Sequence, residues 1–126
     1  MAKTEAKTSK KKSPRLPAQV TLAVNAADDK QAVNVVVLDL RKSAGFTDFF
    51  VIASGTNTRQ VRAIADGVRE ALAGTGVRPA YVEGYDHSEW IMLDYFDFIV
   101  HVFGPETRVL YDLERLWGNA DRIEVN

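Results

Sequence analysis

Residues 90–103 read WIMLDYFDFIVHVF, and this stretch decides the fold. It is almost wholly apolar and rich in β-forming residues, and two aspartates, Asp94 and Asp97, interrupt it near its middle. That pattern predicts two strands joined by a tight turn at Tyr95-Phe96. Side chains alternate between the two faces of a strand, so both faces of this hairpin are apolar. A small domain needs one such face for its core, and the second face needs a separate explanation.

The predicted turn fixes the pairing of the two strands, with Asp94 opposite Asp97. The remaining predicted pairs are Leu93 with Phe98, Met92 with Ile99, Ile91 with Val100 and Trp90 with His101. Because Tyr-Phe is a poor dipeptide for a tight turn, a longer loop is the alternative. A longer loop would shift the pairs but would preserve the division into faces along residues 90–93.

The two faces of the hairpin differ in composition. One face is aliphatic and phenyl, as expected of a core: Ile91, Leu93, Phe98, Val100 and Val102. The other mixes aromatic, thioether and polar groups: Trp90, Met92, Asp94, Asp97, Ile99, His101 and Phe103. Such a mixture is typical of a partner-binding surface, because Trp is favoured at interface hot spots and Met adapts to irregular partners. A helix that covers this face is the alternative, and composition favours neither.

Helical and strand patterns alternate on both sides of the hairpin. We predict helices over residues 17–32, 57–73 and 104–118, and further strands over 33–40, 47–54 and 78–83. The inner stripe of the last helix is predicted to be Val109, Leu110, Leu113, Leu116 and Trp117. This order predicts an α/β domain with a mixed β-sheet of about five strands and flanking helices.

Length and charge divide the 126 residues into a body and a tail. Residues 1–17 hold six basic side chains against one acidic one, a net charge of +5, whereas residues 18–126 carry a net charge of −6. We expect a disordered basic tail over 1–17, a domain over 18–118 and a C-terminal extension over 119–126. An acidic body is unsuited to bind nucleic acid as a whole, although the tail suits non-specific contact with phosphates.

The composition also excludes several classes of protein. The absence of cysteine excludes disulfides, thiolate metal sites and cysteine nucleophiles, and it fits a reducing cytosol. The apolar runs are too short to span a bilayer. We therefore expect a cytoplasmic protein without a membrane segment.

Two stretches suggest nucleotide chemistry. The loop Ser54–Thr58 joins a predicted strand to a predicted helix, where free N–H groups can hold an anion, but it lacks the spaced glycines and the lysine of phosphate-binding motifs. Asp48 resembles a metal-binding aspartate of nucleotidyltransferases, but Phe50 stands where its partner carboxylate would be. Asp39 is the alternative partner. Capping of the helix explains the loop, and we expect no catalysis.

Metal-binding side chains are few. Asp86, His87 and Glu89 lie close together in sequence, and His101 would join them only across the sheet. Without a repeated ligand spacing this is a weak signal, and we expect neither a metal ion nor a cofactor.

Several segments together resemble the ribosomal silencing factor family, also called Iojap-like. The segments, in order, are 36–40, Thr47-Asp48 with Val51-Ile52, 54–61, 63–65, 82–84, 90–94, Asp97 with 99–102, and 108–117. The resemblance covers roughly residues 20–117, and the segments follow the order typical of the family without large gaps.

The resemblance implies a fold related to that of nucleotidyltransferases but without catalytic carboxylates, and a role that is not enzymatic. It implies binding to the free large ribosomal subunit through a ribosomal protein on its intersubunit face. That binding would block joining of the small subunit and lower translation when nutrients are scarce. The resemblance implies that Trp90 contacts the partner, and Met92, Asp94 and His101 are added because they share its face of the hairpin.

Three further interpretations stay open at this stage. One is a nucleotide-binding or nucleotidyltransferase-type module that uses Asp48, Asp39 and the loop Ser54–Thr58. Another is a homodimer in which the Trp90 face is buried against a second copy. The third concerns the Lys-rich tail, which either contacts ribosomal RNA or has no role in binding.

Overall fold

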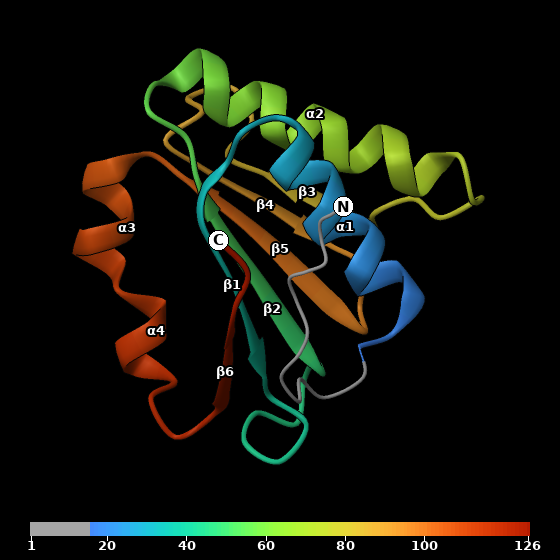
Figure 1. Ribbon diagram of the computed structural model, residues 1–126, viewed down its shortest axis with the longest axis vertical. Coiled ribbons are helices and arrows are strands. Elements are labelled where there is room, and N and C mark those ends of the chain that lie inside the picture. The colour runs from blue at the N-terminus through green and yellow to red at the C-terminus, as the bar shows by residue number, and fades with distance from the viewer. Residues whose placement is uncertain (1–15) are drawn as a thin grey trace.

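A computed structural model describes residues 16–126, so the disorder predicted for the basic tail over 1–17 concerns mainly residues 1–15, which lie outside the described part. Figure 1 shows the arrangement of the helices and strands. The helices are α1 (Ala18–Asp29), α2 (Thr58–Ala73), α3 (Pro105–Tyr111) and α4 (Leu113–Leu116). The strands are β1 (Val33–Asp39), β2 (Phe49–Ser54), β3 (Tyr81–Glu83), β4 (Trp90–Asp94), β5 (Phe98–Phe103) and β6 (Asp121–Glu124).

The strands form one mixed sheet in the order β3-β4-β5-β2-β1-β6. Only β2 and β5 pair in parallel, and the other four pairings are antiparallel. This arrangement confirms the predicted α/β class. The sheet has six strands rather than about five, because residues 121–124, expected in a C-terminal extension, pair with β1. Asn126 also donates a hydrogen bond to the carbonyl of Ala32, so the chain end is tied to the domain.

One face of the sheet is covered by α1 and α2, which lie side by side across it (Figure 1). The buried stripe of α2, the helix predicted over residues 57–73, consists of Val61, Ile64, Ala65, Val68 and Leu72. Asn57 caps this helix by accepting a hydrogen bond from the N–H of Gln60 at 2.9 Å. The predicted core face of the hairpin packs here. No helix in residues 16–126 is long and apolar enough to cross a membrane.

The other face of the sheet is covered only in part, by α3, α4 and the segments around them. Its core consists of Val36, Leu38, Leu40, Phe50, Ile52, Ile99, Phe103 and Leu113. The single helix predicted over residues 104–118 is wrong, since Asp112 adopts a left-handed backbone (φ 46°) and breaks it in two. Only Leu113 of the predicted inner stripe is buried, and Trp117 is half-buried.

The turn of the hairpin lies one residue later than predicted. The N–H of Tyr95 donates to the carbonyl of Phe98 at 3.0 Å, so Tyr95 belongs to the ladder and Phe96-Asp97 form the loop. Two contacts fix this register: Tyr95 stacks on Phe98 at 4.9 Å, and the carboxylate of Asp94 accepts the N–H of Phe96. Trp90 therefore pairs with Phe103, and Met92 pairs with His101. The register shifts by two residues, an even number, so every side chain of β4 and β5 keeps its predicted face, whereas Asp97 lies in the loop.

The hydroxyl of Tyr95 is buried and has no hydrogen-bond partner among the described residues. Burial raises the pKa of Tyr95 to about 12, so the phenol is neutral at physiological pH. A buried donor without a partner destabilises the folded state. We expect Tyr95→Phe to raise the free energy of unfolding by about 1 kcal/mol, measured by urea denaturation. A loss of stability in this variant would mean that the hydroxyl has a partner in solution.

Candidate docking surface

Trp90 is the first residue of β4, and three neighbouring rings fix its indole. The indole Nε1–H donates to Nδ1 of His101 at 3.0 Å. The indole stacks on Phe103 with ring centroids 5.0 Å apart and meets Tyr111 of α3 at 4.5 Å. The Trp90 side chain is only partly buried. The predicted partner-contacting residue therefore lies at the surface, in one defined orientation.

Met92 and Asp94 lie on the same face of β4 as Trp90, because they are two and four residues further along the strand. Both are partly exposed, as a partner contact requires. The Asp94 carboxylate accepts a hydrogen bond from the N–H of Phe96 at 2.9 Å, so it also shapes the turn. The face predicted from the sequence thus brings together Trp90, Met92 and Asp94.

His101 lies on this face as predicted, but its side chain is only 3% exposed. Direct contact between His101 and a partner therefore requires a rearrangement that this structure does not contain. Its ring packs in a T-shaped arrangement against Phe50, with centroids 4.4 Å apart. Burial lowers the pKa of His101 to about 3, so the imidazole is neutral at physiological pH. His101 is therefore buried beneath the surface and contacts Trp90, and it is not itself exposed to a partner.

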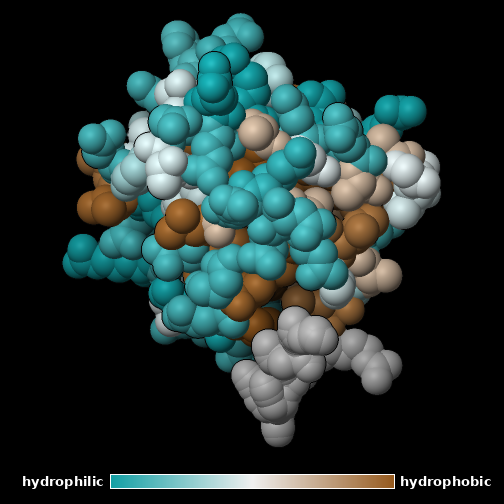
Figure 2. All heavy atoms as spheres, turned by 45° about the horizontal axis from the view of Figure 1, so that its top comes forward, coloured by the Kyte–Doolittle hydropathy of each residue, from teal (hydrophilic) through white to brown (hydrophobic). Residues whose placement is uncertain are grey.

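An exposed apolar ridge lies next to Trp90 and was not predicted as a surface. We define the ridge as Val109, Leu110 and Leu116, which are 78%, 74% and 70% exposed. With Tyr111 they line a shallow hollow of about 510 Å³. Figure 2 shows hydrophobic atoms projecting at the left margin of the molecule, the side on which Figure 1 places α3. Tyr111 contacts Trp90, so the ridge and Trp90 form one continuous surface.

The residues of a nucleotidyltransferase-type site are not brought together. Asp48 directly precedes β2, whereas the loop Ser54–Thr58 begins at the end of the same strand. Asp48 and Ser54 are six residue steps apart along an extended strand, a distance of about 20 Å. Asp39 does lie near Asp48, but Arg41 donates two hydrogen bonds to the Asp39 carboxylate, at 3.0 and 2.7 Å. This guanidinium holds the pKa of Asp39 below its usual value, and the Asp39 carboxylate is already engaged by it.

Several polar groups of the loop Ser54–Thr58 are hydrogen-bonded within the chain. The N–H and the hydroxyl of Thr56 both donate to the side-chain oxygen of Gln60, as in a helix-capping motif. Ser54 accepts a hydrogen bond from Arg108. A hollow of about 610 Å³ adjoins this loop, but both arginines that line it are paired with carboxylates, chiefly that of Glu114. The loop therefore serves as a cap, as the sequence predicted.

A metal site does not form among residues 16–126, in which no three His, Asp or Glu side chains are placed to share an ion. Asp86, His87 and Glu89 are exposed on the loop before β4, whereas His101 is buried with Nδ1 occupied by Trp90. That loop instead holds α2 against the sheet: Ser88 is fully buried and accepts a hydrogen bond from Arg62 at 3.0 Å.

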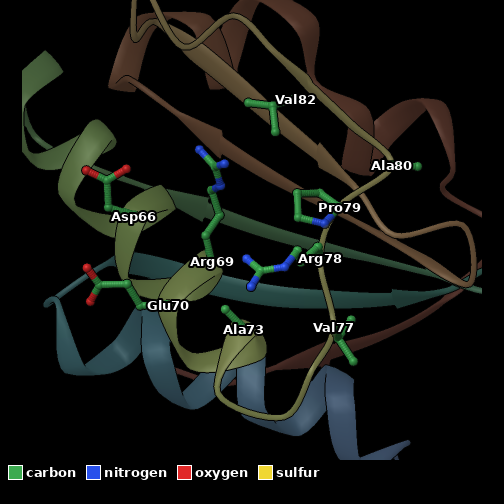
Figure 3. A pocket seen from close by; sticks show the side chains of 9 residues that line it. All are labelled: Asp66, Arg69, Glu70, Ala73, Val77, Arg78, Pro79, Ala80 and Val82. Carbon is green, nitrogen blue, oxygen red and sulfur yellow. The ribbon is translucent and has the colours of Figure 1, made fainter.

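A third hollow, of about 410 Å³, lies between α2 and the segment 77–82 (Figure 3). Figure 3 shows Asp66, Arg69 and Glu70 on the helix and Arg78 on the facing segment. Two cations and two carboxylates balance one another around it. The hollow thus has no net charge that would select an anion or a cation.

These features define an α/β domain with an exposed aromatic and apolar surface, the candidate docking surface, on one face of its sheet. The family model described as ribosomal silencing factor during starvation matches residues 13–126. The chain therefore belongs to the ribosomal silencing factor family.

Individual relatives agree with this assignment. A ribosomal silencing factor of Halalkalibacterium halodurans is 40% identical over 104 residues, which cover 82% of this chain and 89% of that protein. The mouse protein named mitochondrial assembly of ribosomal large subunit protein 1 is 30% identical, and the match covers 78% of this chain and 44% of that protein. A crystal structure of a Chromobacterium violaceum protein matches with a TM-score of 0.77 and 35% identity, covering 79% of this chain and 83% of that one.

Proposed function

We propose that the chain binds the free large ribosomal subunit through a ribosomal protein on the intersubunit face of that subunit. By occupying this face it blocks joining of the small subunit and lowers translation under nutrient limitation. Membership of a family of ribosomal silencing factors supports the role in silencing. The name of the mouse relative, which refers to the large subunit, supports the choice of subunit. The observation that carries the proposal is the continuous surface of Trp90, Tyr111 and the apolar ridge.

The docking surface has the anatomy of a protein–protein interface. Trp90 supplies a large ring that is already held in place, and Met92 supplies an adaptable neighbour. The ridge adds three exposed aliphatic side chains, and a group of exposed apolar side chains on a folded protein is typical of an interaction site. Asp94 lies at the rim and can meet a basic group of the partner. We propose that Trp90, Met92 and Asp94 contact the partner directly. His101 is buried and acts through its hydrogen bond with Trp90.

Charge supports a ribosomal partner in two ways. Residues 18–126 carry a net charge of −6, which complements a basic ribosomal protein and speeds encounter more than it deepens affinity. Residues 1–17 carry +5, and we propose that they add non-specific contact with ribosomal RNA phosphates. The contact with the ribosomal protein would then determine where on the subunit the chain binds. The tail would add affinity that falls as the salt concentration rises.

Cosedimentation with purified ribosomal subunits tests the proposal. We expect the chain to sediment with free large subunits, but neither with small subunits nor with assembled ribosomes, in which the intersubunit face is covered. Sedimentation with small subunits, or equal sedimentation with large subunits and assembled ribosomes, would contradict it.

The ridge gives a separate prediction through Leu110→Ser. Leu110 is 74% exposed, so we expect the free energy of unfolding to change by no more than about 0.5 kcal/mol. We expect affinity for the large subunit to fall about tenfold, since the variant removes an apolar contact from the interface. Val125→Ser, which alters an exposed apolar side chain outside the ridge, is the matched control. Equal affinity of the two variants would exclude the ridge from the interface.

A second copy of the chain is the competing occupant of this surface, because exposed apolar side chains also favour self-association. Sedimentation equilibrium of the free chain distinguishes self-association from binding to a ribosomal partner. A molecular mass that doubles with concentration in the wild type, but not in Leu110→Ser, would assign the ridge to a homodimer.

A further inference from the structure

The structure contains a buried polar side chain whose hydrogen bond is made to Trp90. His101 lies in the middle of β5, between Val100 and Val102, and is 3% exposed. Around its ring are the rings of Phe50 at 4.4 Å, Trp90 at 5.9 Å and Phe103 at 6.1 Å. An apolar residue would pack in this layer without the cost of burying an imidazole. The presence of histidine here needs a reason beyond packing.

The hydrogen-bond pattern fixes the state of the imidazole. Nδ1 of His101 accepts the indole N–H of Trp90 at 3.0 Å, so in the neutral ring the proton is on Nε2. Nε2 is buried and has no hydrogen-bond partner among residues 16–126. Burial keeps the pKa of His101 near 3, so Nδ1 is available as an acceptor at physiological pH. The one hydrogen bond that the His101 imidazole makes among residues 16–126 is therefore the bond to the surface residue Trp90.

We propose that His101 is a positioning residue: its Nδ1 holds the Trp90 indole in the orientation in which the partner receives it. This inference rests on the proposed docking role of Trp90. A partly exposed tryptophan without such an anchor would occupy several rotamers and would have to be ordered on binding. Because His101 removes that freedom before binding, it raises affinity for the large subunit. The same hydrogen bond also orders the Trp90 side chain in the free chain.

The wild-type chain gives the first test, with no substitution needed. Long-range proton–nitrogen correlation spectra of the imidazole report which ring nitrogen carries the proton. We expect Nε2 of His101 to be protonated and Nδ1 to be bare, and the Trp90 indole N–H to exchange slowly with solvent. Comparison with the spectrum of Trp90→Phe assigns the indole signal. A protonated Nδ1, or exchange as fast as that of an exposed indole, would overturn the proposal.

His101→Phe and His101→Asn give the second test. Phenylalanine keeps a ring but removes the acceptor, whereas asparagine offers an oxygen close to the position of Nδ1. We expect His101→Phe to speed exchange of the Trp90 indole N–H at least about tenfold and to weaken binding to large subunits by about three- to tenfold. His101→Asn should restore part of the slow indole exchange and part of the affinity for large subunits. Unchanged indole exchange in His101→Phe, or changed exchange with full affinity, would overturn the proposal.

The outcomes separate this inference from the proposed function. If Trp90→Ala binds large subunits as well as the wild type, the docking role of Trp90 fails, whatever the spectra show. If Trp90→Ala loses binding while His101→Phe keeps it, only the positioning role of His101 fails. If His101→Phe does not fold, the wild-type imidazole spectrum and His101→Asn still decide, since both concern a folded chain.

Discussion

Replacing Trp90 with alanine is expected to weaken binding to the large ribosomal subunit by about 30- to 1,000-fold, the effect of losing about 2–4 kcal/mol at an interface hot spot. The physical reason is that the Trp90 ring combines a large apolar area with an orientation already fixed by His101 and Phe103. Alanine removes both the area and the fixed orientation. The dissociation constant, measured by cosedimentation or fluorescence, checks this prediction.

Two controls accompany the Trp90→Ala variant. Trp90→Phe keeps an aromatic ring and should bind with intermediate affinity, because it loses only the hydrogen bond and part of the area. Arg69→Ala changes an exposed side chain on α2, the helix that covers the opposite face, and should bind as the wild type does. Circular dichroism and the unfolding midpoint must show that each variant is folded. Unweakened binding by a folded Trp90→Ala chain would remove Trp90 from the interface.

Replacing Gly84 with alanine is expected to lower the free energy of unfolding by more than about 3 kcal/mol, for two reasons that act together. Gly84 has a left-handed backbone (φ 80°), which disfavours any side chain. A Cβ atom at this position would also fall onto the carbonyl oxygen of Trp90, a backbone atom that cannot swing aside. The loop before β4 would have to move, and Trp90 with it.

Gly76→Ala is the matched control for Gly84→Ala. Gly76 also has a left-handed backbone (φ 85°), but a Cβ atom there meets nothing within 4 Å. Gly76→Ala should therefore lower the free energy of unfolding by only about 1 kcal/mol, the cost of placing alanine in a left-handed backbone. Urea denaturation of both variants measures the difference, which isolates the steric term at Trp90. Equal losses in the two variants would show that the close approach of Gly84 to Trp90 is relieved at little cost.

The division of the hairpin into two faces could be predicted from the sequence, whereas the pairing within it could not. Alternation along β4 and β5 depends only on the two-residue period of a strand, and a register shift of two residues preserves it. The turn depends on tertiary contacts instead. Tyr95 enters the ladder because its ring is buried against Phe98, and Phe96 takes a left-handed backbone (φ 70°) that its residue type disfavours.

Other features of the site could not be predicted because they arise from long-range contacts. The apolar spacing of residues 109–117 indicates one buried helix stripe, but the left-handed Asp112 rotates α4 relative to α3 and leaves the ridge exposed. The short, mostly polar β6 gives no strand signal, and it pairs with β1, which lies far earlier in the chain, from Val36 opposite Glu124 to Asp39 opposite Asp121. The bond from Trp90 to His101 joins two strands that were predicted to pair, although in a register two residues away from the observed one.

Subunit joining in the presence of the chain tests the central claim most directly. Purified small and large subunits would be mixed with increasing amounts of wild-type chain, and assembled ribosomes would be quantified by light scattering or on sucrose gradients. We expect joining to fall as the chain saturates the large subunits, and to recover when Trp90→Ala replaces the wild type. Saturation of the large subunits by the wild-type chain without any loss of joining would contradict the account.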